Sequence, residues 1–224
     1  MKKMKKKFAL LTALLFVLVT ALCSCGSSID PVAIVKSNLD AAYKGEFNED
    51  MAEYFTDLTS QEDVDAYHEE LVQEYIANYL TYFDVDEAAR TDEFMADVRM
   101  IVEEMMAHAK YTLSDGGKTD TNYNVIVTIE PVNLYYLVQE DWDTMDDAFD
   151  ARNDNYEFSG YSDEQFQAAY DQAILDFVKS KLPEMGHMEA EEYTVRVALE
   201  TDEEADVWCN DNDIQNVCVN MIWD

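Results

Sequence analysis

The sequence predicts an α+β fold in which a layer of helices packs on an antiparallel sheet of about four strands. Apolar residues recur at three- and four-residue spacing over most of the chain, which is typical of amphipathic helices. Two segments, NYNVIVTIEP at 122–131 and EYTVRVALE at 192–200, alternate apolar and polar residues instead, as half-buried strands do. A further short strand at 205–210 and a helix from Asp213 onward are expected after the second of these strands.

The first half of the chain is predicted to be mainly helical. Asp30 and Pro31 are an N-cap and a first-turn proline, and Gly45 ends the helix that they begin. A short helix is expected at 49–55, followed by a capping box at 59–62 that opens a long helix. The apolar stripe of that long helix comprises Val64, Leu71, Val72, Tyr75, Ile76, Tyr79, Leu80 and Phe83. A helix at roughly 90–109 follows, with its own stripe of Phe94, Val98, Ile101 and Met105.

Between the two alternating segments, residues 134–184 are predicted to insert two helices. The first has apolar residues at helical spacing from Leu134 to Phe149, and the second opens with a capping box at 162–165 and ends before Pro183. The second helix is expected to bury Phe166, Tyr170, Ala173 and Phe177. Ahead of the first alternating segment, Asp115-Gly-Gly117 is read as a turn.

Cys209 and Cys218 lie in the strand and the helix expected near the end of the chain. On that interpretation both are small buried residues with free thiols. A disulfide between them remains open, because an extracellular compartment would permit one if the helix folded back to within about 6 Å.

The N-terminus has the pattern of a secretory signal. Lys2, Lys3, Lys5, Lys6 and Lys7 form a basic region, and residues 8–22 form an apolar run that is too short for a bilayer, which needs about 20 residues. The sequence LCSC at 22–25 resembles the lipobox of bacterial lipoprotein precursors. That resemblance implies that Cys23 leaves with the signal peptide and that Cys25 becomes the lipidated first residue of the mature chain. The alternative is ordinary cleavage after Gly26, which would release a secreted protein.

These boundaries give three parts: a signal peptide at 1–24, a lipidated tether at 25–29 and a single domain at 30–224. Without the five signal lysines, ten basic residues stand against 48 acidic ones. So negative a surface repels nucleic acid backbones and anionic headgroups, which excludes nucleic acid as a partner and leaves the N-terminal lipid as the contact with the membrane. A cation-binding role for the acidic surface is a secondary hypothesis, because no calcium loop is recognisable.

Gly-rich phosphate loops, G-x-S-x-G and C-x-x-C are absent from the sequence, and no histidine begins a metal-binding motif. His68 begins HEEL, which lacks the second histidine of HExxH, and His108 follows the apolar face of its helix. Both are interpreted as histidines satisfied within the core, and His187 as a solvated residue in a connection. No cofactor, metal site or catalytic residue is predicted.

The segment DPVAIVKSNLDAAYKGEFNEDMAEYF at 30–55 resembles the opening of uncharacterised lipoproteins of Gram-positive bacteria, with a Lys44-Gly45-Glu46-Phe47 corner between two helices. That group is similar to the NTF2-like (SnoaL-like, cystatin-like) α+β cone, in which helices cover a curved antiparallel sheet. The helices at 134–184 depart from a compact cone.

The sequence favours a lipid-anchored extracytoplasmic binding or interaction domain without catalysis, held on the outer face of the cell membrane. The alternative is a small pocket enzyme of the SnoaL-like isomerase or hydratase type, with His68 or His108 as its base. That alternative requires an open pocket lined by one of these histidines and a carboxylate. A nutrient-importer receptor is disfavoured by size, because such receptors usually have two lobes.

Overall fold

The computed structural model describes residues 19–20, 30–50, 58–119, 122–199, 206–209 and 211–223. Most of the helix expected at 49–55, and Cys25, lie outside these residues. The described helices are α1 (Pro31–Lys44), α2 (Gln61–Tyr82), α3 (Asp92–Ala107), α4 (Leu134–Glu140), α5 (Trp142–Asp154), α6 (Asp163–Lys181) and α7 (Asp211–Trp223), with short 3₁₀ turns η2 (Glu87–Ala89) and η3 (Leu182–Glu184).

The strands form one antiparallel sheet in the order β1-β5-β4-β3-β2. Their bounds are β1 (Val19–Thr20), β2 (Lys110–Lys118), β3 (Asn122–Glu130), β4 (Glu191–Leu199) and β5 (Asp206–Cys209). Because β1 lies within the predicted signal peptide, a chain cleaved before Cys25 would keep β2 to β5. The register pairs Val125 with Val195, and this places the apolar residues of both predicted strands on the same face.

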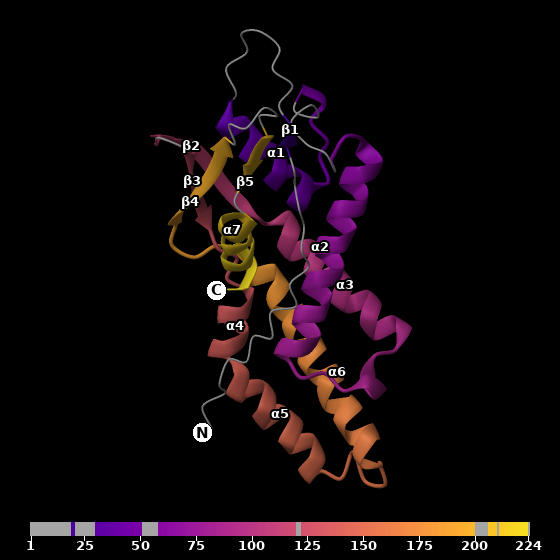
Figure 1. Cartoon of the computed structure of the whole chain (residues 1–224). Coiled ribbons are helices and arrows are strands. Elements are labelled where there is room, and N and C mark those ends of the chain that lie inside the picture. The colour runs from indigo at the N-terminus through magenta and orange to yellow at the C-terminus, as the bar shows by residue number, and fades with distance from the viewer. Residues whose placement is uncertain are drawn as a thin grey trace.

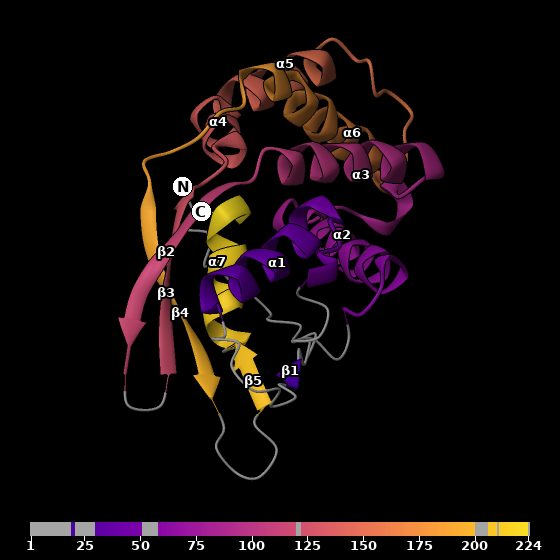
Figure 2. The ribbon, with the colours of Figure 1, turned by 90° about the horizontal axis from the view of Figure 1, so that it is seen from above.

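Helices cover one face of this sheet, as Figure 2 shows. α1 and α7 pack directly on the strands, and α2 and α3 pack on α1. The core lies between these layers and includes the fully buried Ile34, Leu39, Val127 and Ile129. The α+β prediction of a helical layer on an antiparallel sheet is therefore confirmed.

The helices between β3 and β4 extend the molecule in one direction. In Figure 1, α4, α5 and α6 lead from the sheet to the lower end of the view, where the α5–α6 connection forms a tip. α6 packs on α3 and η2 on the way back. The segment at 134–184 contains three helices rather than the two expected, because the helix that begins at Leu134 breaks at Asp141.

Helix α1 follows from its end signals. The Asp30 carboxylate accepts hydrogen bonds from the amides of Val32 and Ala33, and Pro31 fits the first turn because it has no N–H to satisfy there. Gly45 ends the helix with φ of 61°, a left-handed conformation that glycine adopts without a Cβ penalty. The predicted bounds of α1 are confirmed.

Three further local predictions differ from the structure. The long helix α2 begins one residue later than expected. Ser60 is its N-cap: its hydroxyl accepts a hydrogen bond from the Asp63 amide and donates one to the Asp63 carboxylate. The Gly116-Gly117 pair is not a turn, because β2 continues through it with a bulge between Asp115 and Lys118. A Cβ at Gly116 would lie 3.0 Å from the Asn124 carbonyl oxygen, so glycine is favoured where the strands approach closely.

The third error concerns the face of α6. Its capping box, Ser162 with Gln165, is confirmed. The expected stripe is only half-buried, however, and the buried face instead comprises Asp171, Ile174, Leu175, Val178 and Lys181. Tyr170, Ala173 and Phe177 still pack against the core as partly buried residues. The apolar spacing therefore located the edge of the buried face and missed its two ionisable residues, Asp171 and Lys181.

Helix α7 is fixed to the rest of the core through its backbone. The hydroxyls of Tyr43 on α1 and Tyr75 on α2 lie 2.6 Å apart and 3.0 and 3.1 Å from the Cys218 carbonyl oxygen. Its apolar face buries Ile214, Val217, Cys218, Met221 and Ile222, as the periodicity predicted. The Cys218 thiol is free and buried, and burial raises its pKa to about 11. The side chain of Cys209 lies outside the described residues.

Candidate functional site

An open hollow of about 390 Å³ lies beside the corner that follows α1. Its lining comprises Lys36, Asp40, Glu46, Phe47, Asn48, Glu49 and Asp50, so the Lys-Gly-Glu-Phe corner of the lipoprotein resemblance supplies part of its wall. Four of these seven residues are acidic, and Asp40 is the only carboxylate among them that is buried.

Asp40 is held by three donors from two elements. Its carboxylate accepts hydrogen bonds from Lys36, from Lys44 at 2.6 Å and from the Tyr111 hydroxyl on β2 at 2.6 Å. Burial alone would raise the pKa of this carboxyl, but the hydrogen bonds from the two lysines and Tyr111 outweigh it and hold the pKa below its ordinary value. Asp40 therefore stays ionised and joins α1 to the sheet.

The ionisable groups that line this hollow are carboxylates and a lysine. No histidine lines it, and the carboxylate at its base is already neutralised by two lysines. Within the described ranges, no group of three or more histidine, cysteine, aspartate or glutamate side chains is placed to hold a metal ion. The hollow is thus a polar surface depression that can take water or a ligand's polar group.

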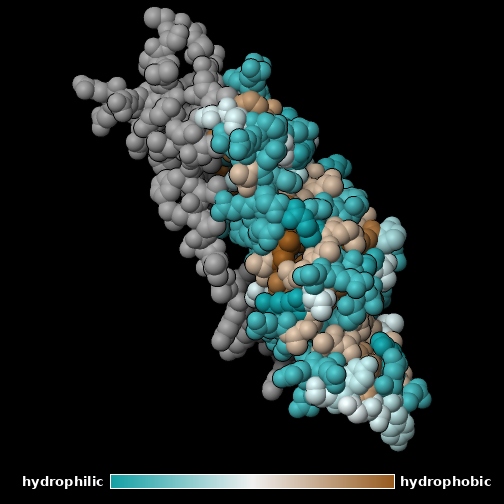
Figure 3. Space-filling model, turned by 90° about the vertical axis from the view of Figure 1, so that its right-hand side faces the viewer, coloured by the Kyte–Doolittle hydropathy of each residue, from teal (hydrophilic) through white to brown (hydrophobic). Residues whose placement is uncertain are grey.

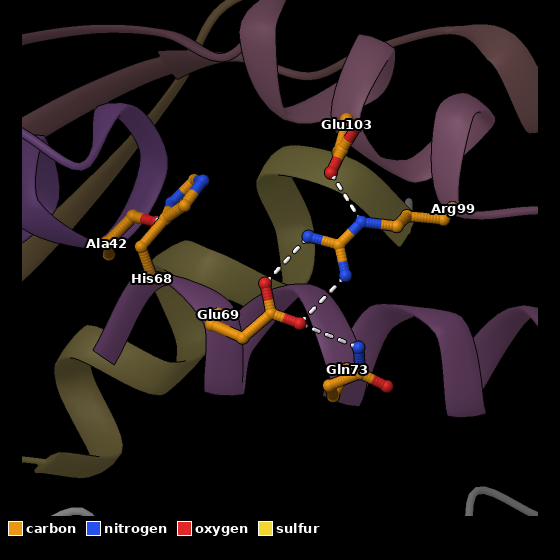
Figure 4. Close-up of polar contacts among 6 residues, drawn as sticks. All are labelled: Ala42, His68, Glu69, Gln73, Arg99 and Glu103. Atoms are coloured by element: carbon orange, nitrogen blue, oxygen red, sulfur yellow. Dashed lines mark hydrogen bonds and ion pairs between the residues drawn. The ribbon is translucent and has the colours of Figure 1, made fainter. Parts of the chain in front are cut away.

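His68, one of the two predicted bases, caps a helix. Its Nδ1–H donates to the Ala42 carbonyl oxygen at 2.7 Å, in the last turn of α1. Figure 4 shows the ring turned toward Ala42, while the neighbouring Glu69 is directed toward α3. A donor at the carboxyl end of a helix satisfies a carbonyl that has no partner within the helix.

Glu69 belongs to an ion-pair network between α2 and α3. Arg99 donates to both Glu69 oxygens, at 2.7 and 2.6 Å, and to Glu103 at 2.7 Å, and Gln73 donates to Glu69 at 2.8 Å (Figure 4). The Arg99 hydrogen bonds lower the pKa of Glu69 to about 2. An acid held so strongly ionised, with both oxygens occupied, is poorly suited to proton transfer at neutral pH.

The other two histidines also donate hydrogen bonds to carbonyl groups at a helix end. His108 lies at the C-cap of α3, partly exposed rather than buried as expected, and its Nδ1–H donates to the Glu104 carbonyl at 2.8 Å. His187 donates from Nε2 to the His108 carbonyl at 2.8 Å. Neither His68 nor His108 is among the residues that line the hollow beside α1, although His108 Nδ1 lies 3.7 Å from the Glu104 carboxylate.

A buried carboxylate that sequence reasoning missed lies on α6. Asp171, 1% exposed, accepts hydrogen bonds from the Asp86 amide and from Gln167, each at 2.9 Å. Burial raises its pKa above the ordinary value. The fully buried Tyr79 hydroxyl makes no hydrogen bond to any described residue. The helical spacing of its neighbours gave no signal that Asp171 is buried, because one of its two partners is a loop amide 85 residues away.

The described part of the face seen in Figure 3 is largely hydrophilic. On the side of the molecule that carries α2, α3 and α6, hydrophobic residues show only in small separate patches (Figure 3). Of the helices in the described part of the chain, none has the length and apolarity needed to cross a membrane.

The fold is similar to that of one solved bacterial structure. This chain aligns with YcdA of Bacillus subtilis, a candidate lipoprotein, with a TM-score of 0.54 and 14% identity, over 86% of this chain and 56% of YcdA. At that identity the likeness shows a shared fold. No family model matches the chain. No curated protein matches it either.

Proposed function

We propose that this chain is a lipid-anchored extracytoplasmic interaction domain with no catalytic centre of its own. The observation that carries this proposal is the similarity of this fold to that of a candidate lipoprotein. The LCSC sequence of this chain, which ends at Cys25, agrees with it. The use of all three histidines as helix-end donors supports a non-catalytic role.

The finer assignments belong to the same proposal. Residues 1–24 are the signal peptide, 25–29 the lipidated tether and 30–224 the extracytoplasmic domain of a Gram-positive, NTF2-like lipoprotein. The helices on one face of an antiparallel sheet support the NTF2-like assignment. The excess of acidic residues supports attachment to the membrane through lipid alone and argues against binding to nucleic acid.

Metabolic labelling with an alkyne palmitate analogue tests the anchor. The full chain should incorporate the label when it is expressed in a Gram-positive host, and Cys25→Ser should abolish the labelling and release the protein into the medium. Cys23→Ala is the matched control, because Cys23 is proposed to leave with the signal peptide. Label retained in Cys25→Ser, or an unlabelled wild-type protein in the medium, would contradict the proposal.

A further inference from the structure

The tip of the molecule formed by residues 154–163, where α5 turns into α6, combines exposed tyrosines with a dense negative charge. Tyr156 is 81% exposed and Tyr161 is 49% exposed, and both lie in this connection. Between residues 143 and 164 the chain has eight acidic residues and one basic residue, Arg152. We propose that this tip is a docking surface for a cationic, arginine- or lysine-rich segment of a partner protein.

A small aromatic core holds the tip in shape. The Phe149 and Phe158 rings stack with centroids 4.8 Å apart, and Phe166 packs against both at 5.4 and 5.6 Å. Phe158 also contacts the Tyr161 ring at 5.6 Å. A surface that is ordered before it binds loses less conformational entropy on binding, and rigid tyrosines are typical anchors of protein interfaces.

The tip already binds a cation from its own chain. The Arg152 guanidinium lies 5.0 Å from the centroid of Phe158 and 5.7 Å from that of Phe149, and it pairs with Glu157 at 2.7 Å. This arrangement combines aromatic faces with a carboxylate around a guanidinium. A second guanidinium or ammonium from a partner would meet the same chemistry at the exposed Tyr156 and Tyr161 rings.

The charge of the tip disfavours ligands other than a cationic polypeptide. Asp150, Asp154, Asp163 and Glu164 are exposed and have no ion-pair partner among the described residues. A second copy of this tip, a nucleic acid or an anionic lipid surface would add like charge and be repelled. A metal ion is disfavoured because no described group of carboxylates converges on one point. A cationic polypeptide satisfies both the charge and the aromatic rings.

The position of the tip fits this use. The chain enters the domain at Asp30, and α1 lies at the sheet end of the molecule, whereas the α5–α6 connection lies at the opposite end (Figure 1). This inference rests on the proposed function: four residues lie between Cys25 and Asp30, and the stretch from Cys25 to Asp30 spans at most about 18 Å. A domain held by that tether would keep its sheet end within reach of the membrane.

Fluorescence anisotropy of a fluorescein-labelled decaarginine peptide tests the proposal, with the full chain in a non-ionic detergent at 150 mM salt. The double variant Tyr156→Asn/Tyr161→Ser should bind about tenfold more weakly than the wild type, as expected for the loss of interface anchors. Asparagine suits position 156 because the backbone there has φ of 62°, which asparagine tolerates. Tyr136→Ser, an exposed tyrosine on α4, is the control and should bind like the wild type.

A second pair of variants separates local charge from total charge. Each variant of this pair removes two exposed carboxylates. Asp150→Asn/Asp154→Asn removes them from the C-terminal end of α5, which leads into the tip, and Glu62→Gln/Glu70→Gln removes them from α2. Only the tip pair should weaken binding. Equal affinities for all variants, or equal losses from both charge pairs, would overturn the proposal. This assay does not depend on the lipid. The docking proposal can therefore be refuted while palmitate labelling supports the anchor, and the anchor can be refuted while the tip binds the peptide.

Discussion

Replacing Tyr43 and Tyr75 by phenylalanine would show whether their hydroxyls contribute two or three hydrogen bonds to the contact that holds α7. The two hydroxyls and the Cys218 carbonyl make three contacts of 2.6, 3.0 and 3.1 Å. Each hydroxyl has only one proton, so at most two of the three contacts are hydrogen bonds at any moment. Burial raises the pKa of both tyrosines well above the ordinary value, so both keep that proton over the ordinary pH range.

If the two hydroxyl protons limit this contact to two hydrogen bonds, the losses in the free energy of unfolding should be additive. Tyr43→Phe and Tyr75→Phe each remove one hydrogen bond, which contributes about 1 kcal/mol to the free energy of unfolding, and the double variant should lose about 2 kcal/mol. If all three contacts contributed independently, each single variant would lose about 2 kcal/mol and the double about 3 kcal/mol. The additivity of the two changes therefore decides between the counts.

Urea unfolding followed by far-UV circular dichroism measures these losses. Tyr136→Phe is the control, since its exposed hydroxyl donates to Glu140 on the same helix and should contribute within about 0.5 kcal/mol. Single losses near 2 kcal/mol with a double loss near 3 kcal/mol would refute the proton count. Losses within error of the control would refute the role of this contact in fixing α7.

Three further predictions concern single side chains. Asp40→Asn should lower the free energy of unfolding by about 1.5–3 kcal/mol, the usual size for hydrogen bonds to a charged group. Because the folded-state pKa of Asp40 is below the unfolded value of 3.8, its stabilisation is complete above that pH and is lost as the pH falls through the folded pKa, so urea titrations of the variant and wild type should converge in acid. His68→Leu should cost about 1 kcal/mol in the same titration through the loss of its bond to α1, and no loss would show that the cap contributes nothing. Ser162→Ala should lower stability by about 1 kcal/mol through loss of the α6 N-cap, whereas Ser159→Ala, in the preceding loop, should not, as thermal unfolding would show.

The elements that the sequence predicted well are those specified by neighbouring residues. The alternation in β3 and β4 and the periodicity of α7 are local patterns, and the caps at Asp30 and Ser162 are local signals. The errors arose where a distant group decides the structure. Gly116 allows β2 to continue because β3 lies against it, and the buried face of α6 includes Asp171 because a loop amide binds it.

The candidate site was less predictable for the same reason. The Lys-Gly-Glu-Phe corner was visible in the sequence, but the contact between Asp40 and Tyr111 joins residues 71 positions apart. The histidines were recognised, yet their acceptors are backbone carbonyls, which every residue has and no sequence pattern marks. For His68 that carbonyl belongs to another helix.

The contact between Tyr43 and Cys218 also bears on when the chain can fold. It joins the first described helix to the last across 175 residues, and both helices pack on the same sheet. Contacts of such long separation form late, because the loop-closure entropy must be overcome before they stabilise anything. Under the proposed function, the exported chain would therefore remain incompletely folded until α7 had crossed the membrane. That delay would suit a translocation route that accepts only unfolded polypeptides.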